Sequence, residues 1–146
     1  MNISSAAFKD GASIPSKYTC DGADTSPPLA FGAIPNGAKT LALIMDDPDA
    51  PGGTFDHWIV WNIPPNTTAI GEGKSPQGVS GRNGFGKSGY GGPCPPSGEH
   101  RYYFKVYALD ATLNLPPSSS KSDLENAMKG HTVAQAQMMG RYKRGS

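Results

Sequence analysis

The stretch TLALIMDDPDAPGGTFDHWIVWNI, residues 40–63, contains two apolar runs separated by a polar turn rich in proline and glycine. The first run, 39–47, is rich in aliphatic residues, and the second, 57–63, is rich in β-branched and aromatic residues. Both runs are typical of buried strands, and we expect them to pair antiparallel through the turn. A plain surface turn needs neither a carboxylate at the end of the first run nor a histidine at the start of the second.

A third core strand is predicted over RYYFKVYAL, residues 101–109, which carries the strongest strand pattern in the chain. The segment before it, 64–98, is rich in Gly, Pro, Ser and Asn. Such a composition prevents long regular elements, so we expect an extended loop region there, with one short strand near 77–79.

The chain changes character after residue 118. Residues 122–125, Ser-Asp-Leu-Glu, have the form of a capping box and predict a short helix that ends near Gly130. Residues 133–139 alternate as a strand would, yet they are mostly helix formers, and we favour a helix for them. The sequence therefore predicts a single domain, 1–146, that is mainly antiparallel β with one or two short C-terminal helices.

Composition excludes several classes of partner. The formal net charge is +1 and 17% of residues are charged, so no basic surface is expected to recruit nucleic acid. No apolar stretch is long enough to span a bilayer and no signal peptide is evident, so we expect a cytoplasmic protein without membrane insertion. The two cysteines, Cys20 and Cys94, leave both a disulfide and free thiols open.

Three polar residues lie in line with apolar strand faces. Because residues two apart in a strand share a face, Asp47 should share one with Met45, and His100 with Tyr102. The same alternation places His57 with Ile59, Trp61 and Ile63. If the second and third strands run in the same direction, all three polar residues meet at one end of the sheet, at the mouth of a small-ligand pocket.

Simpler interpretations exist for each of these residues. An aspartate after a strand usually stabilises a turn, and a histidine at a strand end is usually a satisfied surface or core group. Asp49 and Asp56 fit the turn-stabilising role best, with side chains that accept from nearby backbone N–H groups. The segment 91–100, GGPCPPSGEH, is either a rigid connector or a wall that lets backbone approach a ligand.

Several segments resemble a known family. DPDAP at 47–51, HW at 57–58 and GPCPPSGEHRYYFKVYALD at 92–110 resemble the two signature regions of the phosphatidylethanolamine-binding protein family, also called Raf kinase inhibitor-like proteins. YTCDGADTSPPL at 18–29 and GHTVAQAQMMGRY at 130–142 resemble its shorter bacterial and archaeal branch. The resemblance covers nearly the whole chain.

This resemblance implies a β-sandwich with Greek-key connections, short C-terminal helices and a small anion-binding pocket at one end. It also implies a cis peptide before Pro51, an Arg101 that points to the opposite face, and a homodimer. Family members have been linked to kinase modulation and serine protease inhibition, so a kinase or serine protease is an expected partner. The ligand-binding residues that the resemblance implies are Asp47, Ala50, Pro51, His57, Gly92, Cys94, Pro95, Pro96, His100 and Tyr102.

The ligand class that we favour is a phosphate monoester or a similar small anion. Neutral His57 and His100 can each offer one N–H donor, Tyr102 can donate its hydroxyl, and backbone N–H groups near Gly91 and Gly92 can add more. Asp47 would either orient a histidine or share a proton with the ligand. Binding should strengthen from about pH 8 to 6 as imidazole gains charge.

A hydrolase that uses the Asp and His residues of the pocket, as metal ligands or as general acid and base, is a less favoured alternative. The sequence has no H-E-x-x-H spacing for a metal and no G-x-S-x-G turn for a nucleophilic serine, which leaves Cys94 as the one candidate nucleophile. We therefore expect a binding protein, not an enzyme, with no metal and no cofactor. A protease inhibitor is the alternative, because the Pro/Gly-rich segment 75–92 could enter a protease cleft at low entropic cost.

Overall fold

The structure is a computed structural model that describes residues 1–144. Its centre is the predicted hairpin of β3 (Thr40–Asp47) and β4 (Phe55–Ile63), which pair antiparallel. β7 (Glu99–Leu109) is the predicted third strand and pairs antiparallel with the other side of β3. β4 and β7 therefore run in the same direction, as expected.

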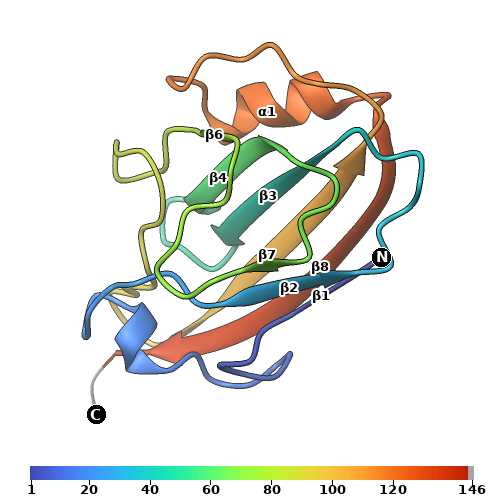
Figure 1. The fold of residues 1–146 in the computed structure, drawn as a ribbon. Helices are drawn as coiled ribbons and strands as arrows, with labels where there is room; N and C mark the ends of the chain where they lie inside the picture. Colours follow the sequence, from blue (N-terminus) through green and yellow to red (C-terminus); the bar gives the residue numbers. More distant parts are fainter. Residues whose placement is uncertain (145–146) are drawn as a thin grey trace.

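Two antiparallel sheets form the domain (Figure 1). The larger sheet has the order β6-β4-β3-β7-β8, with β6 at Val79–Ser80 and β8 at Thr132–Lys143. The smaller sheet has the order β1-β2-β5 and consists of Asn2–Ser4, Leu29–Gly32 and Ala69–Ile70. Within the larger sheet, the spatial order β7-β3-β4-β6 is that of a Greek key, which confirms the expected fold class.

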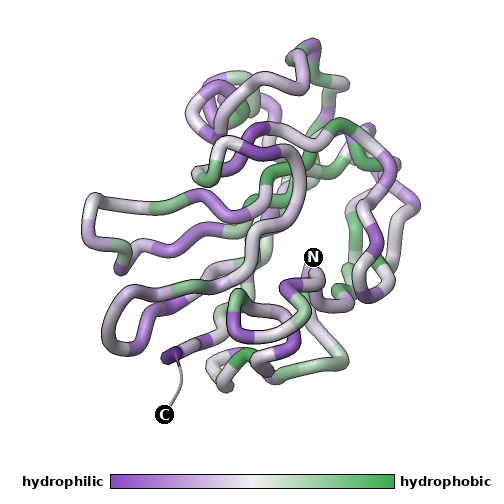
Figure 2. The backbone as a smooth tube through the Cα atoms, turned by 90° about the vertical axis from the view of Figure 1, so that its left-hand side faces the viewer, coloured by the Kyte–Doolittle hydropathy of each residue, from purple (hydrophilic) through white to green (hydrophobic). Residues whose placement is uncertain are grey.

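The core consists of two layers, one on each face of the larger sheet. Alternate residues of β3 and β7, such as Leu43 and Phe104, are buried against Leu29 and Phe31 of the smaller sheet. The other face of the larger sheet packs against Leu124 and its neighbours on α1 (Lys121–Met128). Figure 2 shows hydrophobic (green) stretches of backbone in the middle of the molecule.

The prediction of a helix over 133–139 is wrong, because these residues belong to β8. This strand pairs with β7 from Leu109↔Thr132 to Glu99↔Lys143. Ala134 and Ala136 pack against the core between the sheets, while Gln135 and Gln137 are exposed. Tertiary pairing with a long apolar neighbour has therefore overridden the helix propensity of Ala, Gln and Met.

The α-helix is present, but its cap is not the one predicted. The Ser120 hydroxyl accepts from the Asp123 N–H, and the Asp123 carboxylate accepts from the Ser120 N–H. Ser122 and Glu125 lie inside the helix instead of forming the capping box. No helix within residues 1–144 is long and apolar enough to cross a membrane.

A short 3-10 helix, η1 (Ser16–Tyr18), leads into a loop that a disulfide fixes in place. Cys20 and Cys94 are bonded to each other and lie 74 positions apart in the sequence. The sequence had left this pairing open. Disulfides are typical of oxidising compartments, but they also occur in the cytosol of hyperthermophiles. The bond therefore does not decide the location, and the cytoplasmic location stays a prediction.

Candidate functional site

The C-terminal end of β3 and the N-terminal ends of β4 and β7 meet at one end of the larger sheet. Asp47, His57 and His100 lie there around the ring of Tyr102, and all four residues are buried. They line a cavity of about 320 Å³. The complete lining is Asp47, Ala50, Pro51, Phe55, His57, Phe85, Cys94, Pro95, Pro96, His100 and Tyr102.

All but one of the predicted ligand-binding residues line this cavity. The exception is Gly92, which lines an adjoining cavity of about 230 Å³ and donates its N–H to Asp24. Phe55 and Phe85 line the main cavity and were not predicted. The sequence signals for them were weak: Phe55 lies two residues before His57, and Phe85 is one of two aromatic residues in the Gly-rich segment 81–92.

A β-bulge places His57 in the cavity. Met45 pairs with Trp58 and Asp46 pairs with Asp56, so His57 is an extra residue on β4. His57 and Trp58 therefore both lie on the side of the inter-sheet core, as two residues of a bulge can. The predicted face of His57 is wrong for Ile59 and Trp61, because those side chains lie on the helix side of the sheet. Ile63, the third residue of that predicted face, does lie on the inter-sheet side.

Asp47 orients His100. The Nδ1 atom of His100 lies 2.7 Å from Asp47 Oδ2, and both side chains are almost fully buried. Asp47 Oδ1 accepts from the backbone N–H of Asp49 at 2.7 Å. The turn-stabilising role and the histidine-orienting role therefore both belong to this carboxylate, and His100 keeps its Nε2 atom for the cavity.

The second imidazole is fixed by a backbone carbonyl. His57 Nδ1 donates to the carbonyl oxygen of Gly91 at 2.7 Å, and the side chain is buried. Burial lowers the pKa of His57, an effect that the Gly91 carbonyl and the charge of Asp47 only partly oppose. His57 is therefore neutral near pH 7, and its Nε2 atom is then a hydrogen-bond acceptor.

The expectation that neutral histidines would donate to an anion is wrong for this geometry. Both Nδ1–H groups already donate within the protein, to Gly91 and Asp47. The predicted backbone donors are also engaged. The Gly91 N–H donates to the backbone carbonyl of His57, and the Gly92 N–H donates to the carboxylate of Asp24. The cavity gains imidazole donors only when a proton is added at Nε2.

Tyr102 supplies the remaining donor. Its hydroxyl is buried beside the Asp47 carboxylate and makes no well-aligned hydrogen bond to any residue that the structure describes. Burial raises the pKa of Tyr102, and the nearby charge of Asp47 adds to this effect, so the hydroxyl stays protonated. None of the lysines or arginines in residues 1–144 lines this cavity, so any positive charge in it must come from the histidines.

The wall that contains Cys94 is held against the η1 loop. Besides the disulfide, Cys20 N–H donates to the Pro93 carbonyl at 3.1 Å, and Tyr90 donates its hydroxyl to the Tyr18 carbonyl at 2.6 Å. Because Cys94 is disulfide-bonded, it has no thiol to act as a nucleophile, and that candidate role is wrong.

The 47–56 turn contradicts one expectation and agrees with another. No peptide bond in residues 1–144 is cis, so the cis bond expected before Pro51 is wrong. Asp49 binds the Nε and NH2 atoms of Arg101 at 2.9 and 2.8 Å, together with the Arg101 backbone N–H. These bonds lower the pKa of Asp49 to about 2. Arg101 therefore points away from the cavity, as expected, and fastens the turn to β7.

A buried carboxylate on the other face of the sheet was missed. Asp46 is almost fully buried and lies 3.1 Å from the Nζ atom of Lys105 and 3.2 Å from that of Lys121. Lys121 also pairs with Asp56, which therefore does not take the predicted turn-capping role. Asp46 lies within the predicted strand 39–47 and received no role of its own there, but it anchors α1 to the sheet.

The third histidine lies outside the site. His131 Nδ1 lies 2.8 Å from Asp110 Oδ1, and both side chains are about half exposed. His131 immediately precedes β8 and pairs with the residue that follows β7. It is therefore a natural control for the two buried histidines.

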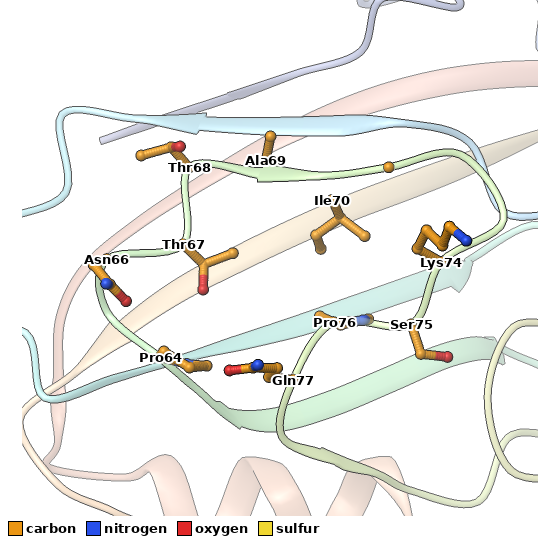
Figure 3. A pocket seen from close by; sticks show the side chains of 11 residues that line it. Pro64, Asn66, Thr67, Thr68, Ala69, Ile70, Lys74, Ser75, Pro76 and Gln77 are labelled. Carbon is orange, nitrogen blue, oxygen red and sulfur yellow. The ribbon is translucent and has the colours of Figure 1, made fainter.

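A larger cavity, of about 440 Å³, lies elsewhere in the molecule (Figure 3). It lies between β5 and the segment 74–77, and small polar residues and prolines form most of its lining. Lys74 is its one charged lining residue, and no histidine or carboxylate accompanies it. Within the described residues, no three His, Cys, Asp or Glu side chains gather as a metal site would require. The 320 Å³ cavity is therefore the better candidate.

Comparisons with known proteins show the family and agree with the fold. The family model described as "Phosphatidylethanolamine-binding protein" matches residues 4–143. A UPF0098 protein of Methanothermobacter thermautotrophicus is 51% identical over 99% of this chain and 100% of its own length. A UPF0098 protein of Aquifex aeolicus is also 51% identical, over 99% of this chain and 89% of its own length.

Two solved structures are similar over almost their whole length. The PEBP homolog CT736 of Chlamydia trachomatis has a TM-score of 0.96 and 44% identity, covering 99% of this chain and 97% of its own. E. coli YbcL, described as a member of the mammalian PEBP family, has a TM-score of 0.92 and 34% identity, covering 99% and 98%. The chain belongs to the phosphatidylethanolamine-binding protein family, in its prokaryotic UPF0098 and YbcL branch.

Proposed function

We propose that the 320 Å³ cavity binds a small oxyanion, with a phosphate monoester such as a phosphoethanolamine-like head group as the favoured class. The observation that carries this proposal is the convergence of two buried imidazoles and an unpartnered tyrosine hydroxyl at one end of the sheet. Each group can donate one hydrogen bond to an oxygen of the ligand once the histidines are protonated.

The anion would enter together with a proton. With neutral histidines, the cavity holds the Asp47 carboxylate, two Nε2 acceptors and a single donor, the Tyr102 hydroxyl. Such a cavity would repel an anion. A proton at the Nε2 atom of either histidine replaces an acceptor with a charged donor, and a charge-assisted hydrogen bond is about twice as strong as a neutral one.

Sulfate binding should therefore strengthen as the pH falls. Sulfate keeps its charge between pH 8 and 6, so any change comes from the protein. Because burial holds the His57 pKa below its ordinary value, this histidine is neutral at pH 8, and uptake of at least one proton per anion gives a Kd at least about tenfold lower at pH 7 than at pH 8. Isothermal titration calorimetry at both values measures this ratio.

The matched control is the exposed histidine. His131→Gln removes the imidazole that pairs with Asp110 outside the cavity, so it should leave the sulfate affinity and its pH dependence unchanged. A Kd that stays constant from pH 8 to 6 would reject proton-coupled binding. Phosphate and phosphoethanolamine titrated at pH 6 complete the test, and no binding of either would reject the proposed ligand class.

Binding is proposed here in preference to catalysis. The candidate nucleophile Cys94 is disulfide-bonded, and the Nδ1 atoms of both histidines serve the fold. Modulation of a kinase, inhibition of a serine protease as the alternative function, and a homodimer remain predictions that rest on the family resemblance. Titration of the protein against chymotrypsin-like and subtilisin-like proteases tests the inhibitor alternative directly.

A further inference from the structure

Phe85 is an unusual side chain for its position. Its side chain is 46% exposed, and it lines both the 320 Å³ cavity and the adjoining 230 Å³ cavity. Single exposed apolar residues are common on protein surfaces and need no explanation by themselves. The surroundings of Phe85, however, hold it in one place at the rim of the proposed anion site.

The loop that carries Phe85 is ordered by one buried side chain. Asn83 Oδ1 accepts from the N–H groups of Phe85 at 2.9 Å and Lys87 at 3.1 Å, and Asn83 Nδ2 donates to the Gly89 carbonyl at 2.9 Å. The Asn83 N–H also donates to the Lys87 carbonyl at 2.8 Å. The backbone that carries Phe85 is therefore held in place by Asn83, and a preordered loop lowers the entropic cost of binding.

Two glycines let the aromatic rings close on one another. A Cβ atom on Gly91 would lie 2.5 Å from the Phe85 ring, and a Cβ atom on Gly84 would lie 2.6 Å from the Phe55 ring. The Phe55 and Phe85 rings are 4.8 Å apart, edge to face, and both also meet the His57 ring edge to face, at 5.0 and 5.6 Å. These rings form a continuous aromatic wall that ends at the imidazole of His57.

The cavity is larger than a bare anion requires. Its volume of about 320 Å³ corresponds to roughly ten water molecules at about 30 Å³ each. Its polar groups are confined to Asp47, His57, His100 and Tyr102, and the rest of the lining is aromatic, proline, alanine and the disulfide sulfur. A ligand that fills it must therefore carry an apolar group beside its anionic one.

We propose that Phe55 and Phe85 form a second subsite that takes a flat unsaturated ring, so that the preferred ligand is an aryl phosphate monoester or a similar aryl acid. This inference rests on the proposed function, because His57, His100 and Tyr102 would hold the acidic group. A ring is preferred to an alkyl chain because it can continue the edge-to-face contacts that the wall already makes. The exposed part of Phe85 is the surface that such a ring would cover.

The test compares esters that share one anionic group. Phenyl, cyclohexyl and ethyl phosphate, with inorganic phosphate as reference, are titrated into the protein by calorimetry at one pH at which all the esters carry the same charge. We expect phenyl phosphate to bind about tenfold more tightly than ethyl phosphate, a difference of about 1.4 kcal/mol, with cyclohexyl phosphate between them. The cyclohexyl ester separates ring geometry from simple apolar area.

Substitutions test whether the preference for phenyl phosphate comes from the aromatic wall. Phe85→Ala should reduce the affinity for phenyl phosphate to that for ethyl phosphate and change the affinity for inorganic phosphate less than twofold. Phe85→Leu should remove the preference for phenyl phosphate over cyclohexyl phosphate. The matched control is Val133→Ala, which truncates another exposed large apolar side chain, on β8. Thermal unfolding and near-ultraviolet circular dichroism check that each variant is folded.

The possible outcomes separate the two proposals. If no phosphate probe binds the wild-type protein, the anion site itself is wrong. If all four probes bind equally, or if Phe85→Ala weakens all of them to the same extent, the anion site stands and the aromatic subsite is wrong. A phenyl preference that Phe85→Ala removes and Val133→Ala leaves intact supports the subsite.

Discussion

Removing the Cys20–Cys94 disulfide is expected to lower the free energy of unfolding by about 4 kcal/mol. The bridge joins residues 74 positions apart, and closing a loop of that length in the unfolded chain carries a large entropic cost. The double substitution Cys20→Ser and Cys94→Ser removes the bridge. Chemical denaturation of this variant and of the wild-type protein, each with and without a phosphine reductant, measures the difference.

The same variant should keep its cavity. The hydrogen bonds from Cys20 N–H to Pro93, from Gly92 N–H to Asp24 and from Tyr90 to Tyr18 still join the two loops. Anion affinity is therefore expected to change less than threefold, while the denaturation midpoint falls. The reductant should have no effect on the double variant, which is the internal control. An unchanged midpoint would show that the bridge contributes little to stability.

Replacing His100 should reduce anion affinity by at least tenfold at pH 6. A hydrogen bond to a charged group contributes about 1.5–3 kcal/mol, and His100 contributes one such donor at Nε2 in the proposed complex. His100→Ala tests this, but it leaves the buried Asp47 carboxylate without its imidazole partner. His100→Asn provides a short amide that can still donate to Asp47 and cannot replace the Nε2 donor.

Both variants are compared with His131→Gln by calorimetry with inorganic phosphate. Loss of affinity in both His100 variants, with His131→Gln unchanged, assigns the effect to the cavity. If His100→Asn binds phosphate as tightly as the wild-type protein, His100 contributes no binding energy and its assigned role is wrong. Denaturation of the two His100 variants shows separately how much stability the buried Asp47–His100 pair provides.

Regular strands made most of the fold predictable. The alternation in 101–109 and the apolar runs on either side of the 47–56 turn located β3, β4 and β7, and hence the sheet end where Asp47 and His100 meet. Strand β8 was not predictable from its own composition. Its residues favour helix when taken alone, and only pairing with β7 along its length makes them a strand.

The site was less predictable where the backbone departs from regularity. Strict alternation assigned His57 to the wrong face, because a bulge is invisible in a hydrophobic pattern. The engagement of both Nδ1 atoms depends on Gly91 and Asp47 being at hydrogen-bond distance, which no local signal reveals. Phe85 lies in a loop whose shape is set by Asn83, so its position at the cavity follows from contacts that only the folded chain makes.

Because of the bulge, the residue at position 57 lines the cavity but is not needed for the pairing of β3 with β4. Because β4 carries one residue more than its neighbour needs at this point, the pairs Met45–Trp58 and Asp46–Asp56 would stay in phase if residue 57 were lost. A deletion or replacement there would change what the cavity can hold and would keep the pairing register of β3 and β4 on either side of it. Evolution can therefore alter or abolish the binding specificity of this fold through a single codon, without rebuilding the hydrophobic interior.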